Sequence, residues 1–503
     1  MSASREKKVR QEQAANGYVD PKIQRENEQK KAEKKSRILY TSIAVVFVVV
    51  ALGLFVWKSG IFQKNATAVS IDGEKYTAAD VSFYSRSIYT YYYNYCQSVY
   101  GSGSYVSYFL TADTLKEAAV QNLTETVNLY NAAIKAGYEK TEEDQQTIDS
   151  AVESMESAAK ANNYSKANYL KALYGNTMTE KVFLKNLEMS TIATSYGQQV
   201  KADFSYTVAD LESYFNENEN NFRYCDYEQF FVSSSADTVD ENGNTVEASE
   251  EDAKAAVEAA AATAQAVLEK FQAGEELKAL SESEEYKDLG TYSHNESGSY
   301  SESDLMKWLF DKSRKDNDST VITVEGSGSY VLVFHSCTRN DYNTVDVRHI
   351  LVEVDKSGLD ASSDTYDADL SKLQDEAKVK AQALLDEWKA GDATAESFGA
   401  LADANSSDSS SAGGLYEKVY KGQMVTEFND WIFDPARKSG DTGLVLTTYG
   451  YHVMYFVGEN VPYWQVQVES AKRSADYNNW YDALCENQTV EQGSGMKYVE
   501  TYL

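Results

Sequence analysis

Residues 38–57 form a run of twenty residues without a charged side chain. As an α-helix, a run of this length crosses about 30 Å of hydrocarbon, so the pattern predicts a membrane-spanning helix. A buried core helix is disfavoured, because core helices are seldom apolar on every face and Trp57-Lys58 is typical of an interfacial anchor. A cleaved signal peptide is the alternative, since Ala66-Thr67-Ala68 resembles a cleavage site. The basic segment and the apolar run are, however, both longer than in such peptides.

After this run the pattern is helical, which predicts an α-helical domain over residues 58–222. Before the helices begin, residues 67–76 indicate a small β-hairpin that turns at Asp72-Gly73. Thr77 and Asp80 then have the spacing of a helix N-cap, in which two side chains satisfy free backbone amides.

The clearest helix of this domain is amphipathic. Its apolar positions recur every three or four residues and stop at Gly137, and glycine is typical of helix C-termini. These positions are Leu115, Ala119, Leu123, Val127, Tyr130 and Ile134. Further stretches with the same spacing cover residues 141–162, 177–203 and 207–220.

Nine tyrosines lie between Tyr84 and Tyr108, with Phe83 and Phe109 beside them. Packing within the helical core is one interpretation of this density. The other is an aromatic surface that binds nonpolar segments of another chain, because tyrosine offers a large contact area with few rotatable bonds.

An internal repeat occupies the second half of the chain. Residues 264–275 and 381–392 are identical at six of twelve positions, and residues 305–318 and 428–441 at six of fourteen, in the same order. Short runs typical of β-strands flank each copy. These runs cover residues 227–232 and 329–334 in the first copy, and 347–352 and 451–456 in the second. Two copies of one structural unit are therefore expected.

The repeat predicts two α+β domains, at residues 223–340 and 341–460. Polar insertions at residues 233–250 and 355–368 follow the first strand of each copy and are expected to be surface loops. Helical spacing returns over residues 461–503, and this segment is expected to rejoin the helical domain.

The net charge of −31 at pH 7 is unevenly distributed. Residues 1–37 contain eleven basic and six acidic residues, so the remaining chain carries a charge of −36. Such an acidic body repels nucleic acid, and DNA or RNA is not expected as a partner. By the positive-inside rule, the basic tail 1–37 is expected in the cytoplasm and residues 58–503 outside it.

The second copy contains six ordered motifs. They are Val347-Arg-His-Ile-Leu-Val352, Ser407-Asp408, Gly413-Gly414-Leu415, Gly422-Gln-Met-Val-Thr-Glu-Phe428, Gly440-Asp441 and Thr447-Thr-Tyr-Gly-Tyr-His-Val453. Together they resemble the parvulin family of peptidyl-prolyl isomerases. The order of anchor, helical domain, parvulin-like domains and C-terminal helix resembles the PrsA-type and SurA-type extracytoplasmic foldases of bacteria.

The chemistry explains these residue types. Rotation about an X-Pro bond faces a barrier of about 18 to 20 kcal/mol, which falls when the amide loses conjugation. A catalyst must hold the proline ring in an apolar pocket and support the twisted amide, without a covalent nucleophile. The resemblance implies that His349 and His452 are paired central histidines on adjacent strands. It places Asp408 where family members carry Cys or Asp.

The resemblance also assigns the remaining site residues. Thr447 would orient the histidine pair through hydrogen bonds. Met424 and Phe428, four residues apart on one helix face, would line the proline pocket. No cofactor and no metal are implied.

Two features depart from the family. Members commonly have Gly-Gly-Asp-Leu-Gly, whereas Gly413-Gly414 is followed here by Leu415-Tyr416-Glu417, so the loop beside the pocket is altered. Many PrsA-type proteins are anchored through a lipid-modified cysteine. No cysteine lies near the apolar run here, and the helix itself is expected to be the anchor.

Alignment of the two copies indicates that the first copy has lost the site. The replacements are Gln229 for His349, Tyr330 for His452, Leu305 for Phe428 and Ser301 near the position of Met424. The first domain is therefore expected to be catalytically silent. His294 and His335 fall on no matching position and are interpreted as incidental.

The four cysteines, Cys96, Cys225, Cys337 and Cys485, are widely spaced and form no CxxC pair, so no cysteine metal site is expected. In the parvulin fold the strands that carry Cys225 and Cys337 are antiparallel neighbours, which would allow a disulfide. Cys96 and Cys485 would pair only if the C-terminal helix packs on the helical domain. Four free buried thiols are the alternative.

The resemblance implies an α+β multidomain protein with an N-terminal transmembrane helix, an α-helical SurA/PrsA-like domain and two tandem parvulin-like domains, the first degenerate. The C-terminal helix would return to the helical domain. The implied function is that of a single-pass cell-membrane isomerase and foldase for unfolded secreted polypeptides with X-Pro bonds. A non-catalytic holdase or scaffold is the alternative, and an assembly factor for one surface protein is a third. The oligomeric state is not indicated.

Overall fold

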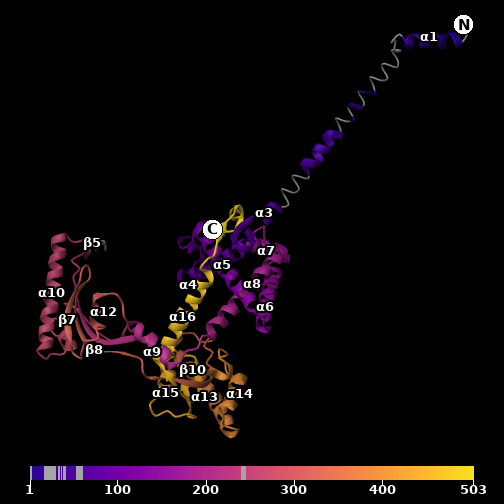
Figure 1. The fold of residues 1–503 in the computed structure, drawn as a ribbon. Helices are drawn as coiled ribbons and strands as arrows, with labels where there is room; N and C mark the ends of the chain where they lie inside the picture. Colours follow the sequence, from indigo (N-terminus) through magenta and orange to yellow (C-terminus); the bar gives the residue numbers. More distant parts are fainter. Residues whose placement is uncertain are drawn as a thin grey trace. The chain divides into compact units, whose positions relative to one another are not determined.

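The computed structural model describes residues 3–15, 30–31, 34–35, 37, 41–51, 61–239 and 245–503. The chain divides into two compact units, which are drawn with the rest of the chain in Figure 1. The helical unit combines the residues up to Asp203 with Tyr477–Leu503, and the two-sheet unit is Phe204–Asp476.

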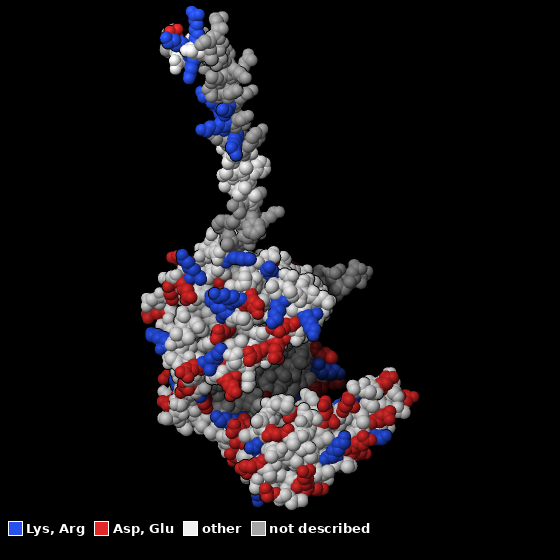
Figure 2. All heavy atoms as spheres, turned by 90° about the vertical axis from the view of Figure 1, so that its right-hand side faces the viewer, with Lys and Arg blue, Asp and Glu red and all other residues white. Residues whose placement is uncertain are grey.

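The described N-terminal stretch is helical. Helix α1 covers Ala3–Ala15, and residues 41–51 form another helical stretch with exposed side chains. The predicted membrane span 38–57 is only partly described, because residues 38–40 and 52–57 lie outside the described residues. Among the residues that the structure describes, no helix is long and apolar enough to cross a membrane. Figure 2 shows Lys and Arg side chains gathered on the described N-terminal residues, whereas acidic and basic side chains are interspersed over the visible face of the remaining chain.

Helices α4, α5 and α8 pack against one another in the helical unit, around a core that includes Leu123, Val127 and Phe183. The helices of this unit are α3 (Ile61–Asn65), α4 (Ala78–Tyr100), α5 (Ala112–Ala136), α6 (Glu142–Ala161), α7 (Lys166–Tyr174), α8 (Glu180–Asp203), the end of α16 (Tyr463–Cys485), and the 3-10 helices η1 (Gly103–Tyr108) and η4 (Ser494–Tyr498). A small sheet has the order β13-β1-β2. Its strands are β1 (Thr67–Ile71), β2 (Glu74–Thr77) and β13 (Val490–Gln492).

The predicted turn and helix-end signals of this unit are confirmed. Strands β1 and β2 form a hairpin with Asp72 and Gly73 at positive φ, 49° and 83°. The Thr77 hydroxyl accepts from the Asp80 amide, and the Asp80 carboxylate accepts from the Thr77 amide, which caps α4. Helix α5 ends at Gly137, whose φ of 75° is the left-handed conformation that glycine adopts without cost.

The C-terminal residues complete the helical unit. Strand β13 pairs with β1, and the Ser85 hydroxyl donates to the Glu500 carbonyl at 2.6 Å. Asn128 of α5 donates to Gln488 at 3.2 Å, and Val499 packs in the same core as α4 and α5. Segments from the two ends of the chain therefore stabilise each other within one unit.

Two four-stranded antiparallel sheets with the same topology form the two-sheet unit. The first has the order β6-β3-β8-β7 and the second the order β10-β9-β12-β11. The first copy comprises β3 (Arg223–Ser233), β4 (Thr238–Val239), β5 (Thr245–Val246), α10 (Glu250–Gln272), α11 (Leu277–Glu282), β6 (Thr291–Gly298), α12 (Asp304–Leu309), β7 (Ser319–Val324) and β8 (Gly328–Arg339). The second comprises β9 (Asn343–Glu353), α13 (Tyr366–Ala390), α14 (Ala395–Asn405), η3 (Ala412–Gly414), β10 (Leu415–Val419), α15 (Thr426–Ile432), β11 (Thr442–Leu446) and β12 (Gly450–Pro462). The sequence repeat is therefore also a structural repeat.

The register of the central strands aligns the two copies residue by residue. Strands β3 and β8 pair in the same register as β9 and β12. This register places Gln229 at the position of His349 and Tyr330 at the position of His452. The predicted loop 233–250 includes residues 240–244, which lie outside the described residues.

Helix α9 (Val208–Glu217) belongs to the two-sheet unit, although the predicted helical domain extends to residue 222. Its Leu211 and Phe215 pack against Trp464 near the start of α16, and this contact holds α9 to the two-sheet unit. Helix α16 therefore begins in one unit and ends in the other, whereas the sequence assigned all of residues 461–503 to one segment. The boundary between the two predicted α+β domains stays a prediction.

Cys225 and Cys337 form a disulfide between β3 and β8, where they lie directly opposite each other. Cys96 and Cys485 are free thiols. The end of α16 does pack within the helical unit, but Cys485 accepts a hydrogen bond from Asn128 at 3.1 Å and forms no disulfide with Cys96. The structure therefore contains one of the two pairings that the sequence left open.

The tyrosines of residues 84–108 divide between core and surface. Tyr84 is buried, whereas Tyr91 is 67% and Tyr108 82% exposed. The exposed large residues of this segment are Tyr91, Tyr93, Tyr95, Val99, Tyr100, Tyr105, Tyr108 and Phe109, which we call the tyrosine surface. Core packing thus accounts for only part of the tyrosine density.

Candidate active site

Two histidines meet on the central strands of the second sheet. His349 lies on β9 and His452 on β12, and the register pairs His452 with Leu351, two residues after His349. Side chains at such diagonal positions share one face of the sheet. Both imidazoles are buried, and their Nδ1 atoms are 3.0 Å apart. The structure thus brings the two predicted histidines into direct contact.

Hydrogen bonds continue from both ends of the pair. His349 Nε2 lies 3.2 Å from a carboxylate oxygen of Asp408, and His452 Nε2 lies 2.9 Å from the Thr447 hydroxyl. Because an ionised carboxylate only accepts, His349 donates from Nε2, and its Nδ1 accepts from Nδ1–H of His452. His452 Nε2 then accepts from the Thr447 hydroxyl. We assign these tautomers because they give each of these atoms a partner.

Asp408 is held in the loop that follows α14. The Ser407 amide donates to the Leu351 carbonyl at 2.9 Å, which ties this loop to β9. One carboxylate oxygen of Asp408 accepts from the Ser410 amide and hydroxyl, at 2.9 and 2.6 Å. The other accepts from the Tyr416 hydroxyl at 2.8 Å. These donors fix the carboxylate beside the imidazole pair.

Gly414 lets the chain pass directly over β9. Its φ is 59°, and a Cβ at this position would lie 2.1 Å from the His349 carbonyl oxygen. Arg348 holds the same crossing by donating to the Gly413 carbonyl at 2.8 Å. A glycine is therefore required where β10 begins, and the crossing carries Tyr416 to Asp408.

Burial keeps the histidine pair uncharged. Burial and the neighbouring His349 lower the pKa of His452 to about 4. Burial also lowers the pKa of His349, and Asp408 opposes part of this shift. Burial of Asp408 by itself would raise its pKa, but hydrogen bonds from Ser410 and Tyr416 and the proximity of His349 lower it to about 2. At neutral pH an uncharged pair thus lies beside an ionised carboxylate.

The pair borders a pocket of about 410 Å³ with an aromatic wall. Phe428 of α15 is buried, and its ring centroid lies 5.4 Å from that of His349 and 5.3 Å from that of His452, edge to face. Met424 lines the same pocket just before α15. Thr447 lies behind His452 and does not line the pocket. Five of the six predicted site residues therefore line one cavity, and the sixth, Thr447, is hydrogen-bonded to His452.

The first sheet has a different set of residues at these positions. Tyr330 contacts Phe231, with ring centroids 4.6 Å apart and the ring planes tilted by 35°, and its hydroxyl lies 3.2 Å from that of Ser327. Leu305 packs in the apolar cluster of α12. Among the described residues of this sheet, no histidine occupies either counterpart position.

Two parts of the chain match known protein families. Residues 28–196 match the SurA-like N-terminal domain. Residues 330–459 match the PPIC-type PPIase domain, and this match includes every residue of the pocket and of the hydrogen-bonded chain. The second sheet and its helices form a PPIC-type peptidyl-prolyl isomerase domain. The resemblance to parvulin-type isomerases that the motifs indicated is thus confirmed. The match leaves residues 223–329 outside the isomerase domain.

Solved structures that are similar to the chain include the following three. PrsA from Bacillus cereus, a peptidylprolyl isomerase, is 20% identical and covers 29% of this chain and 51% of its own, with a TM-score of 0.18. PrsA from Bacillus subtilis is 13% identical and covers 75% of this chain and 85% of its own, with a TM-score of 0.25. The third structure comes from a study of PEB4 and Cj1289, two structurally related SurA-like chaperones of Campylobacter jejuni. It is 11% identical and covers 65% of this chain and 97% of its own, with a TM-score of 0.17. The chain spans about half the length of the first of these, and no curated protein matches it.

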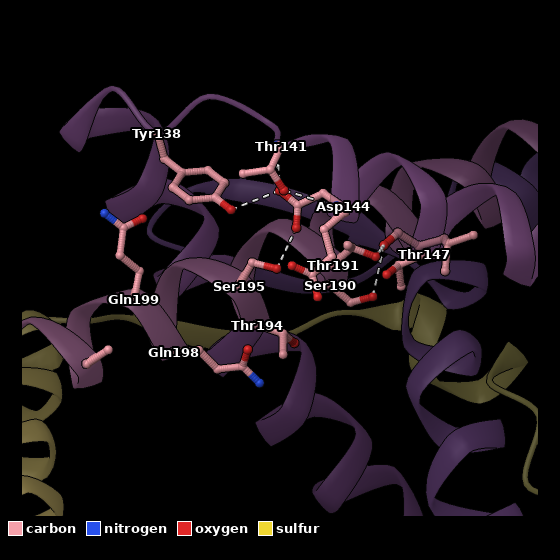
Figure 3. A pocket seen from close by; sticks show the side chains of 13 residues that line it. Tyr138, Thr141, Asp144, Thr147, Ser190, Thr191, Thr194, Ser195, Gln198 and Gln199 are labelled. Atoms are coloured by element: carbon pink, nitrogen blue, oxygen red, sulfur yellow. Dashed lines mark hydrogen bonds between the residues drawn. The ribbon is translucent and has the colours of Figure 1, made fainter. Parts of the chain in front are cut away.

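A second cavity, of about 700 Å³, lies in the helical unit, lined by residues of α6 and α8 (Figure 3). Its buried carboxylate, Asp144, accepts from the Tyr138 and Ser195 hydroxyls and from the Thr141 amide. These bonds cap α6 and tie it to α8, so the carboxylate has a structural role. The residues that line this cavity include no histidine or cysteine.

Tyr416 is the residue of the isomerase domain that the sequence interpretation missed. Its ring centroid lies 5.2 Å from that of His349, and its hydroxyl binds Asp408. It pairs with Val347 in the register of β9 and β10, so it shares a face with His349 two residues further along. Only the register between these strands reveals this position.

We expect the imidazole of His452 in the folded chain to stay neutral until the pH approaches about 4, and that of His349 to protonate below its ordinary pKa. Unfolded chains bind these protons near pH 6.5, so the free energy of unfolding should decrease as the pH falls from about 6.5 toward 4. An NMR titration of the histidine side chains measures both pKa values, with the urea-unfolded chain as the control. Values near 6.5 in the folded chain would contradict a buried neutral pair.

Proposed function

We propose that the chain is a peptidyl-prolyl cis/trans isomerase and foldase that acts on unfolded secreted polypeptides outside the cytoplasm. The observation that carries this proposal is the buried, hydrogen-bonded His349–His452 pair beside an apolar pocket. Such a site supplies shape and fixed hydrogen bonds, with no activated nucleophile. This suits a rotation in which no covalent bond breaks.

The pocket lowers the rotational barrier by favouring the twisted amide over the planar one. Resonance separates charge between the nitrogen and oxygen of a planar amide, and twisting removes this separation. Transfer from water to an apolar wall therefore costs the twisted state less than the planar state. Phe428 and Met424 supply that wall, and an uncharged pair avoids the desolvation that an imidazolium ion would suffer.

Asp408 and Thr447 act as positioning residues in this scheme. Each holds the outer nitrogen of one histidine and so decides which nitrogen carries the proton. Neither needs to contact the peptide. Their role is to keep the surface that meets the amide rigid and uncharged.

We expect the full chain to accelerate cis/trans exchange of an X-Pro peptide. His452→Ala or Met424→Ala should raise the barrier of the catalysed reaction by about 1 to 3 kcal/mol, the scale of lost positioning in active sites. Exchange rates measured by NMR on a proline-containing peptide check this.

The matched control is Tyr330→Ala, at the position of the first sheet that corresponds to His452. The first sheet is proposed to be a degenerate, catalytically silent copy, so this variant should keep the full rate. An unchanged rate in His452→Ala, or an equal loss in Tyr330→Ala, would contradict the assignment.

The extracytoplasmic location is part of the proposal, and the sequence supports it. Eleven basic residues precede the uncharged run 38–57, which would anchor the chain with its N-terminus in the cytoplasm. Protease added outside intact cells should then digest residues 58–503 and spare the tail 1–37. In permeabilised cells the tail should be digested as well. Protection of residues 58–503 would show that the topology is the reverse of the one proposed. A mature chain that begins near Val69 would show that the N-terminal segment is cleaved.

A holdase is the second candidate function, and the tyrosine surface favours it. Exposed aromatic rings on α4 and η1 offer contact area to nonpolar segments of an unfolded chain. Each ring contact contributes about 1 kcal/mol, roughly fivefold in affinity. Tyr91→Ser combined with Tyr108→Ser should therefore weaken the suppression of client aggregation, measured by light scattering. His452→Ala should suppress aggregation like the parent. Loss of this suppression in His452→Ala would show that client binding depends on the isomerase site.

A further inference from the structure

The other two of the four histidines also lie together. His294 on β6 and His335 on β8 flank β3, and their ring centroids are 5.7 Å apart. Asp226 on β3 lies between them, with a carboxylate oxygen 2.6 Å from His294 Nε2. Potential ligand atoms of these three residues all lie within 4.8 Å of one another.

A bulge in β8 directs His335 to this cluster. Strand β3 pairs with Phe334 and Ser336, so His335 is the extra residue between them. Its Nε2 lies 3.1 Å from a carboxylate oxygen of Glu228, the residue opposite His294 in the register. Three adjacent strands thus present two imidazoles and two carboxylates on one face.

This combination of groups is typical of a transition-metal site. Imidazole with carboxylate suits zinc, nickel, copper and iron, whereas calcium and magnesium prefer oxygen ligands alone. In a tetrahedral site with bonds of about 2.1 Å, neighbouring ligand atoms are about 3.4 Å apart. The observed separations, from 2.6 Å to less than 4.8 Å, lie on both sides of this value. The imidazoles are 26% and 39% exposed, so an ion can reach them.

We propose that Asp226, His294 and His335 bind one divalent ion of the zinc class. Nδ1 of His335 lies 3.2 Å from an Asp316 carboxylate, which holds the proton there and leaves Nε2 for the metal. An outer carboxylate of this kind commonly fixes the ring of a ligand histidine. The ion joins strands β6, β3 and β8 and stabilises the first sheet.

The second sheet shows that the fold does not require these residues. The counterparts of Asp226, Glu228, His294 and His335 in the register are Asp346, Arg348, Leu415 and Val457. Only the first of these could bind a cation. The cluster is therefore specific to the sheet that lacks the isomerase histidines, and it lies on the opposite face of β3 from Gln229.

The test is a titration of the chelator-treated full chain with Zn²⁺ by calorimetry. One ion should bind per chain, and Zn²⁺ should raise the midpoint of thermal unfolding. In parallel, Co²⁺ should give the visible absorption of a tetrahedral site, which Zn²⁺ abolishes and Ca²⁺ does not. NMR signals of His294 and His335 should shift on adding Zn²⁺, while those of His349 and His452 stay in place. This measurement needs no variant.

Double histidine variants of the two sheets show which histidines bind the ion. The double variant His294→Gln/His335→Gln, with its fold checked by circular dichroism, should lose Zn²⁺ binding. The matched double variant His349→Gln/His452→Gln should keep it. Asp316→Asn should bind one ion with about 10- to 100-fold lower affinity.

Three results would overturn the proposal. If the parent binds no Zn²⁺, the cluster is an ion-pair network only. If binding survives in His294→Gln/His335→Gln, or is lost in His349→Gln/His452→Gln, the ion lies elsewhere.

Discussion

The arrangement of residues in the isomerase site depends on one hydrogen bond between two buried, uncharged imidazoles. It exists only while one Nδ1 donates and the other accepts, since a second proton would leave two donors 3.0 Å apart. Burial beneath Phe428 keeps the pair neutral, and Asp408 and Thr447 fix the position of each proton. The apolar wall that keeps the histidines neutral is also the wall proposed to receive a proline ring. Two requirements of the chemistry are thus satisfied by one packing arrangement.

The repeated sheet shows that one backbone topology supports two different histidine pairs. In the second sheet both imidazoles are about 5% exposed, and they have each other as partners. In the first sheet both imidazoles are partly exposed, and their partners are carboxylates. Burial favours the neutral ring of His349 even beside Asp408, whereas solvent and nearby carboxylates leave the rings of the first sheet open to the proposed metal ion. The surroundings of the rings, and not their residue type, therefore decide the chemistry.

Local and ordered patterns could be predicted from the sequence. The hairpin at Asp72-Gly73, the cap at Thr77 and the helix end at Gly137 each depend on a few neighbouring residues. The histidine pair could be predicted because six motifs occur in a fixed order. The first-sheet cluster could not, because it depends on strand register and on a bulge that no local pattern encodes. The place of helix α9 in the two-sheet unit could not be predicted for a related reason, since a residue distant in sequence, Trp464, holds it there.

The altered loop beside the pocket illustrates how the register changes an interpretation. In sequence, Leu415-Tyr416-Glu417 after the two glycines looked like a departure that alters the loop beside the pocket. In the structure β10 begins directly at Leu415, and this places the Tyr416 hydroxyl on Asp408 at 2.8 Å. Burial and that carboxylate raise the pKa of Tyr416, so the phenol remains a donor, and its bond helps to keep Asp408 ionised. An ionised Asp408 in turn holds the proton of His349 on Nε2. The departure therefore reinforces the neutral pair.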